Sequence, residues 1–291
     1  MCATCGCGAS DPTITDLQTG ERHALGKAAA QPHRHADGTW HVHEHDHDQD
    51  HHGAQEHDHH HGHEHDQPST TVVELNLRVL ERNDRAAERN RAWLMGREVL
   101  ALNLMSGPGA GKTTLLERTI ADLKSRKIFV LEGDQATDRD GDRVKAAGAD
   151  AVQINTGSGC HLDAEMVARG LTVLKPDTGA LLFIENVGNL VCPALFDLGE
   201  HRRVAILSVT EGDDKPLKYP HMFRAADLLL LSKIDLLAHV DFDVGDAIAH
   251  AKDVNPGIEA LPVSARTGEG MGAWEDWIAR AQQDAAAAAF A

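Results

Sequence analysis

The sequence predicts an α/β protein with a doubly wound, mostly parallel sheet, preceded by a disordered tail. Over residues 68–291, short apolar runs typical of buried strands alternate with helical stretches. Strands that are buried on both faces and joined by helices form parallel sheets. The first seventy residues, in contrast, are nearly devoid of large apolar side chains and cannot offset the entropy lost on ordering.

Seven strands and five helices are expected from the apolar pattern. The strands are predicted at residues 99–105, 127–131, 151–154, 180–184, 204–209, 228–231 and 258–263. Helices are predicted at residues 113–124, 163–174, 244–253 and 271–282, and one more, whole or broken, runs from Val72 to about Arg97. Because ligands of such sheets bind at the carboxyl ends of the strands, motifs that follow strands are the candidates for function.

The tail has two parts. Residues 1–8 form a cysteine box, and residues 9–67 combine a small-residue linker without periodicity with a low-complexity tract. The tract, from His33 to His65, holds fourteen of the twenty histidines, and nine acidic residues in and beside it supply about half of the formal charge of −17. This acidic balance argues against non-specific binding to nucleic acid or to an anionic membrane.

The sequence also indicates a compartment. It contains no run of eighteen apolar residues and does not start with a basic segment followed by an apolar core, so neither a transmembrane helix nor a signal peptide is expected. Five cysteines without an export signal point to reduced thiols, which favour metal or redox roles when clustered. We therefore expect a cytoplasmic protein.

A phosphate-binding loop directly follows the first predicted strand of the domain. The sequence Ser-Gly-Pro-Gly-Ala-Gly-Lys-Thr begins at Ser106, which replaces the usual glycine, and a helix follows. Backbone N–H groups of such a loop turn toward the phosphates, Lys112 neutralises their charge, and the Thr113 hydroxyl binds Mg²⁺. The candidate nucleotide-binding residues here are Gly107, Gly109, Ala110, Gly111, Lys112, Thr113 and Thr114.

Two later loops predict which base the nucleotide carries. In Ser232-Lys233-Ile234-Asp235, the aspartate follows a strand and can accept hydrogen bonds from guanine N1–H and N2–H₂, which adenine does not offer in that arrangement. Ser264 and Ala265 follow the last strand and are typical of a second guanine-contacting loop. The order of these motifs after a phosphate loop predicts GTP, with Lys233 and Asp235 at the base.

Two segments are candidate switches. The first begins with Glu132-Gly133-Asp134 and leads to Asp138, Asp140 and Asp142. Carboxylates there can hold Mg²⁺ through water or orient the attacking water, or the aspartates from Asp138 to Asp142 can simply form a solvated acidic loop. The second carries an acidic residue and a glycine that senses the γ-phosphate, Glu185 and Gly188. The candidates for catalysis are Lys112, Asp134, Asp140 and Glu185.

Two groups of candidate metal ligands lie in the tail. Cys2, Cys5 and Cys7 offer three soft thiolates, which suit square-planar nickel or trigonal zinc or copper, although a redox pair or incidental cysteines are alternatives. The histidines from His33 to His65 can hold several Ni²⁺, Zn²⁺ or Cu²⁺ ions without defined geometry, or merely keep the chain soluble.

A third group lies in the domain. Cys160 and His161 follow the strand at residues 151–154, and Cys192 lies four residues beyond Gly188. Cysteine and histidine are ligands that nickel and zinc share, but two adjacent residues rarely complete a coordination sphere. Cys192 or a second chain must then help, and the alternative is two buried apolar-like cysteines beside a satisfied histidine.

With these motifs the chain resembles the hydrogenase nickel-incorporation GTPase (HypB) family, of the SIMIBI class of phosphate-loop proteins. The matching stretches are residues 1–8, 106–116, 132–135, 155–163, 184–193, 211–223, 232–237 and 264–271. ATPases of the same class carry an additional lysine early in the loop, where Gly107 stands here.

The resemblance implies a GTPase, and together with the ligand chemistry above the expected cofactors are GTP, Mg²⁺, Ni²⁺ and Zn²⁺. It implies delivery of Ni²⁺ to the large-subunit precursor of [NiFe]-hydrogenase with a nickel-insertion accessory protein. It also implies a GTP-dependent homodimer with a metal site at Cys160, His161 and Cys192. A related GTPase that serves urease, and a nickel store in which GTP binding is vestigial, are the alternatives.

Overall fold

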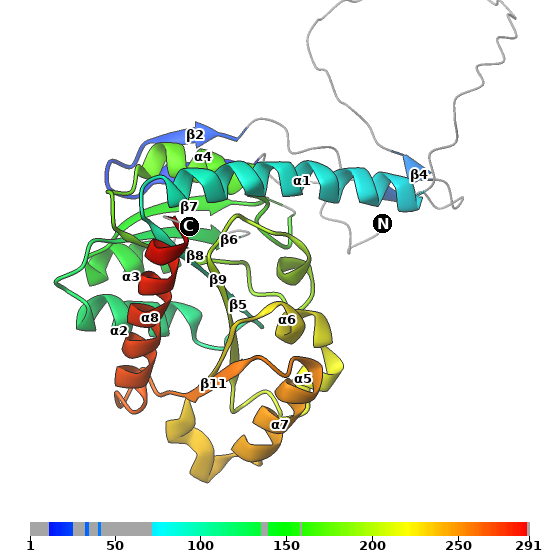
Figure 1. Cartoon of the computed structure of the whole chain (residues 1–291), viewed down its shortest axis with the longest axis vertical. Helices are drawn as coiled ribbons and strands as arrows, with labels where there is room; N and C mark the ends of the chain where they lie inside the picture. The colour runs from blue at the N-terminus through cyan, green and yellow to red at the C-terminus, as the bar shows by residue number, and fades with distance from the viewer. Residues whose placement is uncertain are drawn as a thin grey trace, which may run out of the picture.

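The computed structural model describes residues 12–25, 33–34, 40–41, 72–134, 139–157 and 159–289. A nine-stranded sheet with the order β11-β10-β9-β5-β8-β6-β7-β1-β2 forms the centre of the molecule (Figure 1). Its seven parallel strands are β5 (Leu100–Ser106), β6 (Ile128–Asp134), β7 (Asp150–Asn155), β8 (Leu181–Glu185), β9 (Arg202–Ser208), β10 (Leu228–Ser232) and β11 (Glu259–Pro262). All seven strands were predicted from the apolar runs, so the α/β class is confirmed.

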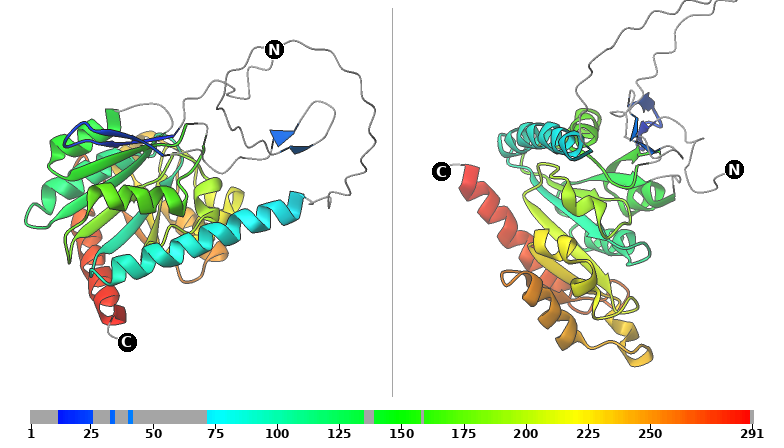
Figure 2. Two further views of the ribbon diagram at one scale, coloured as in Figure 1. Left: turned by 90° about the horizontal axis from the view of Figure 1, so that it is seen from above. Right: turned by 90° about the vertical axis from the view of Figure 1, so that its right-hand side faces the viewer.

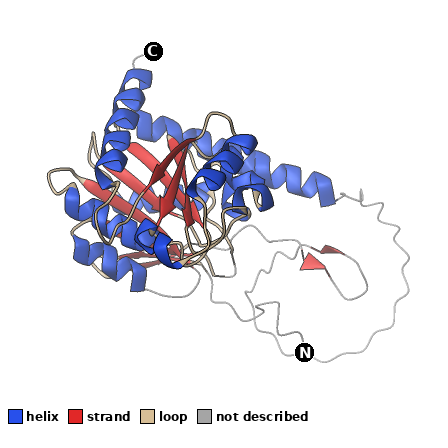
Figure 3. Ribbon diagram, turned by 90° about the horizontal axis from the view of Figure 1, so that it is seen from below, coloured by secondary structure: helices blue, strands red, loops and turns tan. Residues whose placement is uncertain are grey.

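Helices cover both faces of the sheet (Figure 3). The helices are α1 (Val72–Met95), α2 (Lys112–Asp122), α3 (Arg139–Ala147), α4 (Ala164–Leu174), α5 (Lys215–Lys218), α6 (Pro220–Ala225), α7 (Val244–Val254) and α8 (Met271–Ala289), with 3₁₀ turns η1 (Cys192–Leu195) and η2 (Ile234–His239). One core joins the sheet to α2, α3 and α8, and the cores of the other face join it to α1 and α4 and to α6 and α7. Figure 2 shows the helices around the sheet from two further sides.

The strands are apolar on both faces because both faces are covered. In β5, every residue from Leu100 to Ser106 is buried, and the core of α2, α3 and α8 takes Leu100, Leu102 and Leu104 while Ala101 and Met105 face the other side. The continuous apolar run in the sequence therefore reflects burial between two helical layers. Among the described residues, no helix is both long and apolar enough to span a membrane.

Part of the expected linker belongs to the sheet. β1 (Thr13–Asp16) pairs antiparallel with β7, and β2 (Arg22–Ala24) pairs antiparallel with β1. The prediction of a linker without periodicity in the first part of residues 9–67 was therefore wrong at this hairpin. β7 offers a free edge of backbone groups, and Ile14, Leu17 and Leu25 supply the buried side chains. A second, two-stranded sheet joins β3 (His33–Arg34) and β4 (Trp40–His41).

The structure describes part of the first expected switch segment. Asp140 and Asp142 lie in the first turn of α3, where acidic side chains favour a helix N-terminus, rather than in an acidic loop. Asp138 lies outside the described residues. Cys2, Cys5 and Cys7 also lie outside them, as does most of the tract from His33 to His65.

Candidate functional site

The phosphate loop lies between β5 and α2, at the carboxyl edge of the parallel strands, as the motif predicts. Gly109 and Gly111 have φ values of 75° and 98°, a region that favours glycine. Gly107 is required for another reason, because a Cβ atom there would lie 2.7 Å from Glu211 Oε1. Ala110 is buried against the core, and α2 begins at Lys112.

Ser106, which departs from the usual motif, binds the lysine of the loop. Lys112 Nζ donates a hydrogen bond of 2.9 Å to Ser106 Oγ, and the Ser106 hydroxyl donates to the carbonyl of Gly107 at 2.6 Å. Burial lowers the pKa of Lys112, while the carboxylates of Glu185, Asp140, Glu211 and Glu132 raise it in that order of strength. The four carboxylates therefore offset part of the cost of burying the ammonium group.

Thr113 and Glu185 form the part of the site suited to Mg²⁺. Thr113 Oγ1 donates a hydrogen bond of 2.7 Å to Glu185 Oε1, and Glu185 Oε2 is buried without a hydrogen-bond partner in the described part of the chain. Burial raises the pKa of Glu185 to about 6, although the charge of Lys112 lowers it. A hydroxyl and a dehydrated carboxylate are hard oxygen ligands, so these residues fit Mg²⁺.

Two carboxylates at this site were given no catalytic role from the sequence. Glu132 pairs in register with Glu185 on the neighbouring strand and is 2% exposed. Glu211 Oε2 accepts a hydrogen bond of 2.9 Å from Ser208 N, which places its other oxygen beside Gly107. Each follows or ends an apolar run, and this position at the carboxyl edge is the signal that could have identified them.

The three predicted nucleotide loops contact one another. Ser232 Oγ donates to the carbonyl of Ala110 at 2.7 Å, and Lys233 Nζ donates to the carbonyl of Gly109 at 2.6 Å. Ser264 Oγ donates to Asp235 Oδ1 at 2.7 Å, which connects the two base loops. Arg118 Nη1 donates to the carbonyl of Ala265 at 3.4 Å from α2. The residues predicted to bind phosphate and base therefore form one continuous surface.

Gly188 lies directly against the phosphate loop. A Cβ atom at this position would be 3.1 Å from Pro108 Cα and 3.3 Å from Pro108 N.

Of the two candidate catalytic aspartates, Asp140 raises the pKa values of both Lys112 and Glu185. Asp134 ends β6, where its carbonyl accepts from Thr156 N at 2.9 Å. Thr114, on α2, accepts a hydrogen bond of 3.1 Å from Arg143.

The structure brings the three candidate metal ligands of the domain together. One ligand atom from each of Cys160, His161 and Cys192 lies within 4.8 Å of the other two, and Cys160 Sγ is 3.6 Å from His161 Nδ1. The rings of His161 and Phe196 stack with centroids 3.9 Å apart. This convergence from two separate segments favours a ligand set over unrelated buried side chains.

A metal bound at this cluster would have to displace a proton from Cys160 but none from His161. Burial raises the pKa of the Cys160 thiol to about 11, with the Cys192 sulfur adding to the shift. Burial also lowers the pKa of His161, which keeps the imidazole neutral. Two thiols and a neutral imidazole form a soft to borderline donor set of the kind that nickel and zinc share.

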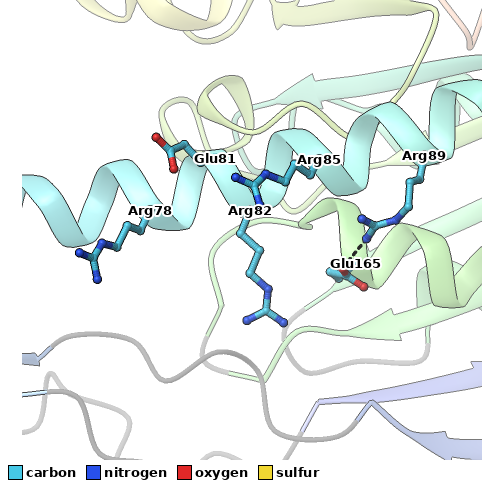
Figure 4. Close-up of a pocket in the computed structure, with 6 residues that line it drawn as sticks. All are labelled: Arg78, Glu81, Arg82, Arg85, Arg89 and Glu165. Carbon is cyan, nitrogen blue, oxygen red and sulfur yellow. Dashed lines mark hydrogen bonds and ion pairs between the residues drawn. The ribbon is translucent and has the colours of Figure 1, made fainter.

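A hollow on the surface of α1 holds none of these residues. Arg78, Arg82, Arg85 and Arg89 lie along it with Glu81 and with Glu165 of α4 (Figure 4). Arg89 donates to Glu165 at 2.8 Å. No nucleotide or metal ligand identified above lines this hollow, so it is distinct from the candidate site.

Comparison with known proteins agrees with this geometry. The family described as CobW/HypB/UreG, nucleotide-binding domain, matches residues 101–262. The hydrogenase maturation factor HypB of Azotobacter chroococcum mcd 1 is 60% identical over 210 residues, which are 72% of this chain and 69% of the relative. The factor of the same name from Cupriavidus necator is 41% identical over 330 aligned positions, covering 99% of this chain and 91% of the relative.

A solved structure is similar as well. The crystal structure of HypB from Helicobacter pylori in complex with nickel is 37% identical, with a TM-score of 0.66, over 70% of this chain and 96% of that one. The family match at residues 101–262 spans more than half of the chain, and the two relatives are 60% and 41% identical to it. The chain therefore belongs to the CobW/HypB/UreG family and, within it, to the hydrogenase maturation factors HypB.

Proposed function

We propose that the chain is a GTP-hydrolysing nickel metallochaperone that binds, stores and delivers Ni²⁺ for the maturation of [NiFe]-hydrogenase. One observation carries the proposal: the nucleotide site and the cysteine–histidine cluster share a segment. Asn186, beside Glu185, accepts a hydrogen bond of 3.1 Å from the backbone N–H of Leu162, which follows His161. Residues 185–192 then continue past Gly188 to Cys192.

Each residue of the nucleotide site has a role in this proposal. The loop N–H groups and Lys112 bind the phosphates, and Asp235 selects guanine. Thr113 and Glu185 hold Mg²⁺, which supplies charge neutralisation at the transferred phosphoryl group. Asp140 or Asp134 orients the attacking water. Gly188 contacts the γ-phosphate through its N–H, so that its position differs between GTP and GDP.

The metal cluster completes the proposal. Cys160, His161 and Cys192 offer three ligands per chain, whereas nickel and zinc take about four, so a second copy or water supplies the remainder. A symmetric, GTP-dependent homodimer is the simplest arrangement that doubles the ligand set. The nickel-insertion accessory protein and the hydrogenase large-subunit precursor are the proposed partners, in the cytoplasm.

A nickel titration of the full chain, with and without GTP and Mg²⁺, tests the proposal. Nickel affinity should depend on the nucleotide, and by linkage GTP affinity should depend on nickel by the same factor. A nickel store with a vestigial nucleotide site would bind the same ions but show no nickel-linked GTP hydrolysis. A rate of GTP hydrolysis that stays the same at every nickel concentration would favour that alternative.

A further inference from the structure

Arg143 joins the first switch to the helix that follows the phosphate loop. The residue lies on α3, one turn after Asp140, and its guanidinium group faces α2. Arg143 Nε and Nη2 donate to Glu117 Oε1 and Oε2 at 3.0 and 2.7 Å. Such a two-pronged pair fixes the plane of the guanidinium group, which a lysine could not do.

The same group also binds a residue of each neighbouring motif. Arg143 Nη1 donates to Asp140 Oδ1 at 3.1 Å, and Nη2 donates to Thr114 Oγ1 at 3.1 Å. Thr114 directly follows Thr113, the candidate Mg²⁺ ligand, and Asp140 is a candidate catalytic residue. One side chain therefore connects the start of α3 to the first two turns of α2.

This cluster adjoins the nucleotide site. Thr114, which Arg143 binds, directly follows Thr113, and the Thr113 hydroxyl donates to Glu185 Oε1 at 2.7 Å. Arg143 and Asp140 are 42% and 41% exposed, so an ion pair between them would contribute little to stability on its own. Its fixed geometry is the more consequential property, because a small misplacement of a catalytic group reduces turnover strongly.

We propose that Arg143 is a positioning residue for GTP hydrolysis, held by Glu117, and that it orients the Asp140 carboxylate toward the site formed by Lys112, Thr113 and Glu185. The inference rests on the proposed GTPase function and deepens it. It selects Asp140 over Asp134 as the switch aspartate that acts on the attacking water or on the water shell of Mg²⁺. Arg143 makes no bond to the nucleotide in this proposal and acts through Asp140.

A double-mutant cycle on the full chain tests the proposal. Steady-state GTP hydrolysis is measured for the native protein, Arg143→Gln, Asp140→Asn and the double variant. Each single variant should lower kcat by about tenfold or more, with little change in KM for GTP. The double variant should be no slower than Asp140→Asn alone, because the arginine acts through the aspartate.

Further variants separate positioning from folding. Arg143→Lys keeps the charge but not the planar fork, and should recover only part of the lost kcat. Glu117→Gln removes the anchor but no group near the phosphates, and should lower kcat in the same direction by a smaller factor. Arg89→Gln is the matched control, since Arg89 forms an exposed pair with Glu165 at 2.8 Å, and its kcat should equal the native value.

The outcomes distinguish this inference from the function on which it rests. A native chain that does not hydrolyse GTP would overturn both. Native turnover with single-variant losses that multiply in the double variant would overturn only the role of Arg143 through Asp140. If Arg143→Gln lowers the melting temperature but leaves kcat unchanged, the arginine only stabilises the fold. That outcome would also reject its positioning role.

Discussion

The hydroxyl of Thr113 donates a hydrogen bond of 2.7 Å to one oxygen of Glu185, and the other oxygen of that carboxylate is buried without a hydrogen-bond partner in the described part of the chain. A carboxylate in this state is costly to ionise unless a cation accompanies it. The carboxylate of Glu185 should therefore affect both the binding of Mg²⁺ and the pH dependence of the free energy of unfolding.

The first prediction concerns the stability of the nucleotide-free protein. Burial raises the pKa of Glu185 from 4.5 to about 6, so the folded state binds this proton more tightly than the unfolded state. Its stabilising contribution is full below pH 4.5 and is lost as the pH rises through about 6. The free energy of unfolding of Glu185→Gln minus that of the native protein should therefore rise by about 2 kcal/mol between acid and neutral pH.

Urea unfolding at a series of pH values, without nucleotide or Mg²⁺, measures this difference. The subtraction removes the titration of the other carboxylates, which both proteins share. A difference that stays level, or falls as the pH rises, would show that Glu185 ionises normally. The same variant should lose GTP hydrolysis, because it removes a ligand that fits Mg²⁺.

The second prediction concerns the choice of base. Asp235→Asn should shift the preference from guanine toward xanthine nucleotides, because an amide can donate to the additional carbonyl of xanthine. Competition for turnover among GTP, ATP and XTP measures the shift. Asp241→Asn, at an exposed position outside these loops, is the control. Equal turnover of ATP and GTP by the native protein would end the assignment of guanine.

The third prediction concerns the contact between Gly188 and Pro108. Gly188→Ala places a methyl group 3.1 Å from Pro108 Cα, so the phosphate loop or the switch must move by a few tenths of an ångström. The ratio of affinities for a non-hydrolysable GTP analogue and GDP should fall, because the displaced N–H is the group proposed to contact the γ-phosphate. Gly272→Ala, where a Cβ meets nothing within 4 Å, should leave the ratio unchanged. Equal ratios in both variants would show that the Gly188 N–H does not contact the γ-phosphate.

The fourth prediction separates storage from catalysis. Deletion of residues 33–66 should lower the nickel stoichiometry several-fold and leave GTP hydrolysis intact, because the tract supplies imidazoles but no catalytic group. Replacement of Cys2, Cys5 and Cys7 should remove one tight site instead. Equilibrium dialysis counts the ions in each case. An unchanged stoichiometry after the deletion would mean that the tract only keeps the chain soluble.

The fifth prediction concerns coupling between the two sites. Nickel affinity should differ between the complexes with GDP and with a non-hydrolysable GTP analogue, because Cys192 follows Gly188 on one segment. Cys192→Ala should abolish the difference and leave the site at Cys2, Cys5 and Cys7 untouched. Calorimetric nickel titrations measure both. Identical native affinities in the two nucleotide states would reject the coupling even if both sites bind their ligands.

Much of the fold was predictable because the decisive signals are local. Apolar runs such as Leu228 to Leu231 are short, continuous and bounded, and burial on both faces makes them so. The phosphate loop was predictable for a similar reason, since its chemistry requires glycines, a lysine and a threonine in one short stretch. Ser106 departs from the usual motif, and only the structure shows that its hydroxyl oxygen accepts a hydrogen bond from Lys112.

Other parts of the site depended on pairings between distant segments. Thr13 to Asp16 contain too few apolar residues to predict a strand alone, and they form one because β7 has a free edge. Glu211 reaches Gly107, and Arg143 reaches Glu117, across separations that no periodicity encodes. Such contacts follow from chain packing, so the sequence could name the residue types but not their partners.

By itself, the sequence determined the α/β class, the positions of seven strands, the phosphate loop and the kinds of metal ligand available. Each of these is specified by side chains within a few residues of one another. The tertiary structure alone decided that the hairpin joins the sheet and that Asp140 begins a helix and binds Arg143. It also gave the geometry of Cys160, His161 and Cys192, which the family resemblance had grouped without distances. The physical reason is that these contacts close loops between separate strands and helices, and their geometry is set only when the buried sheet and its two helical layers pack together.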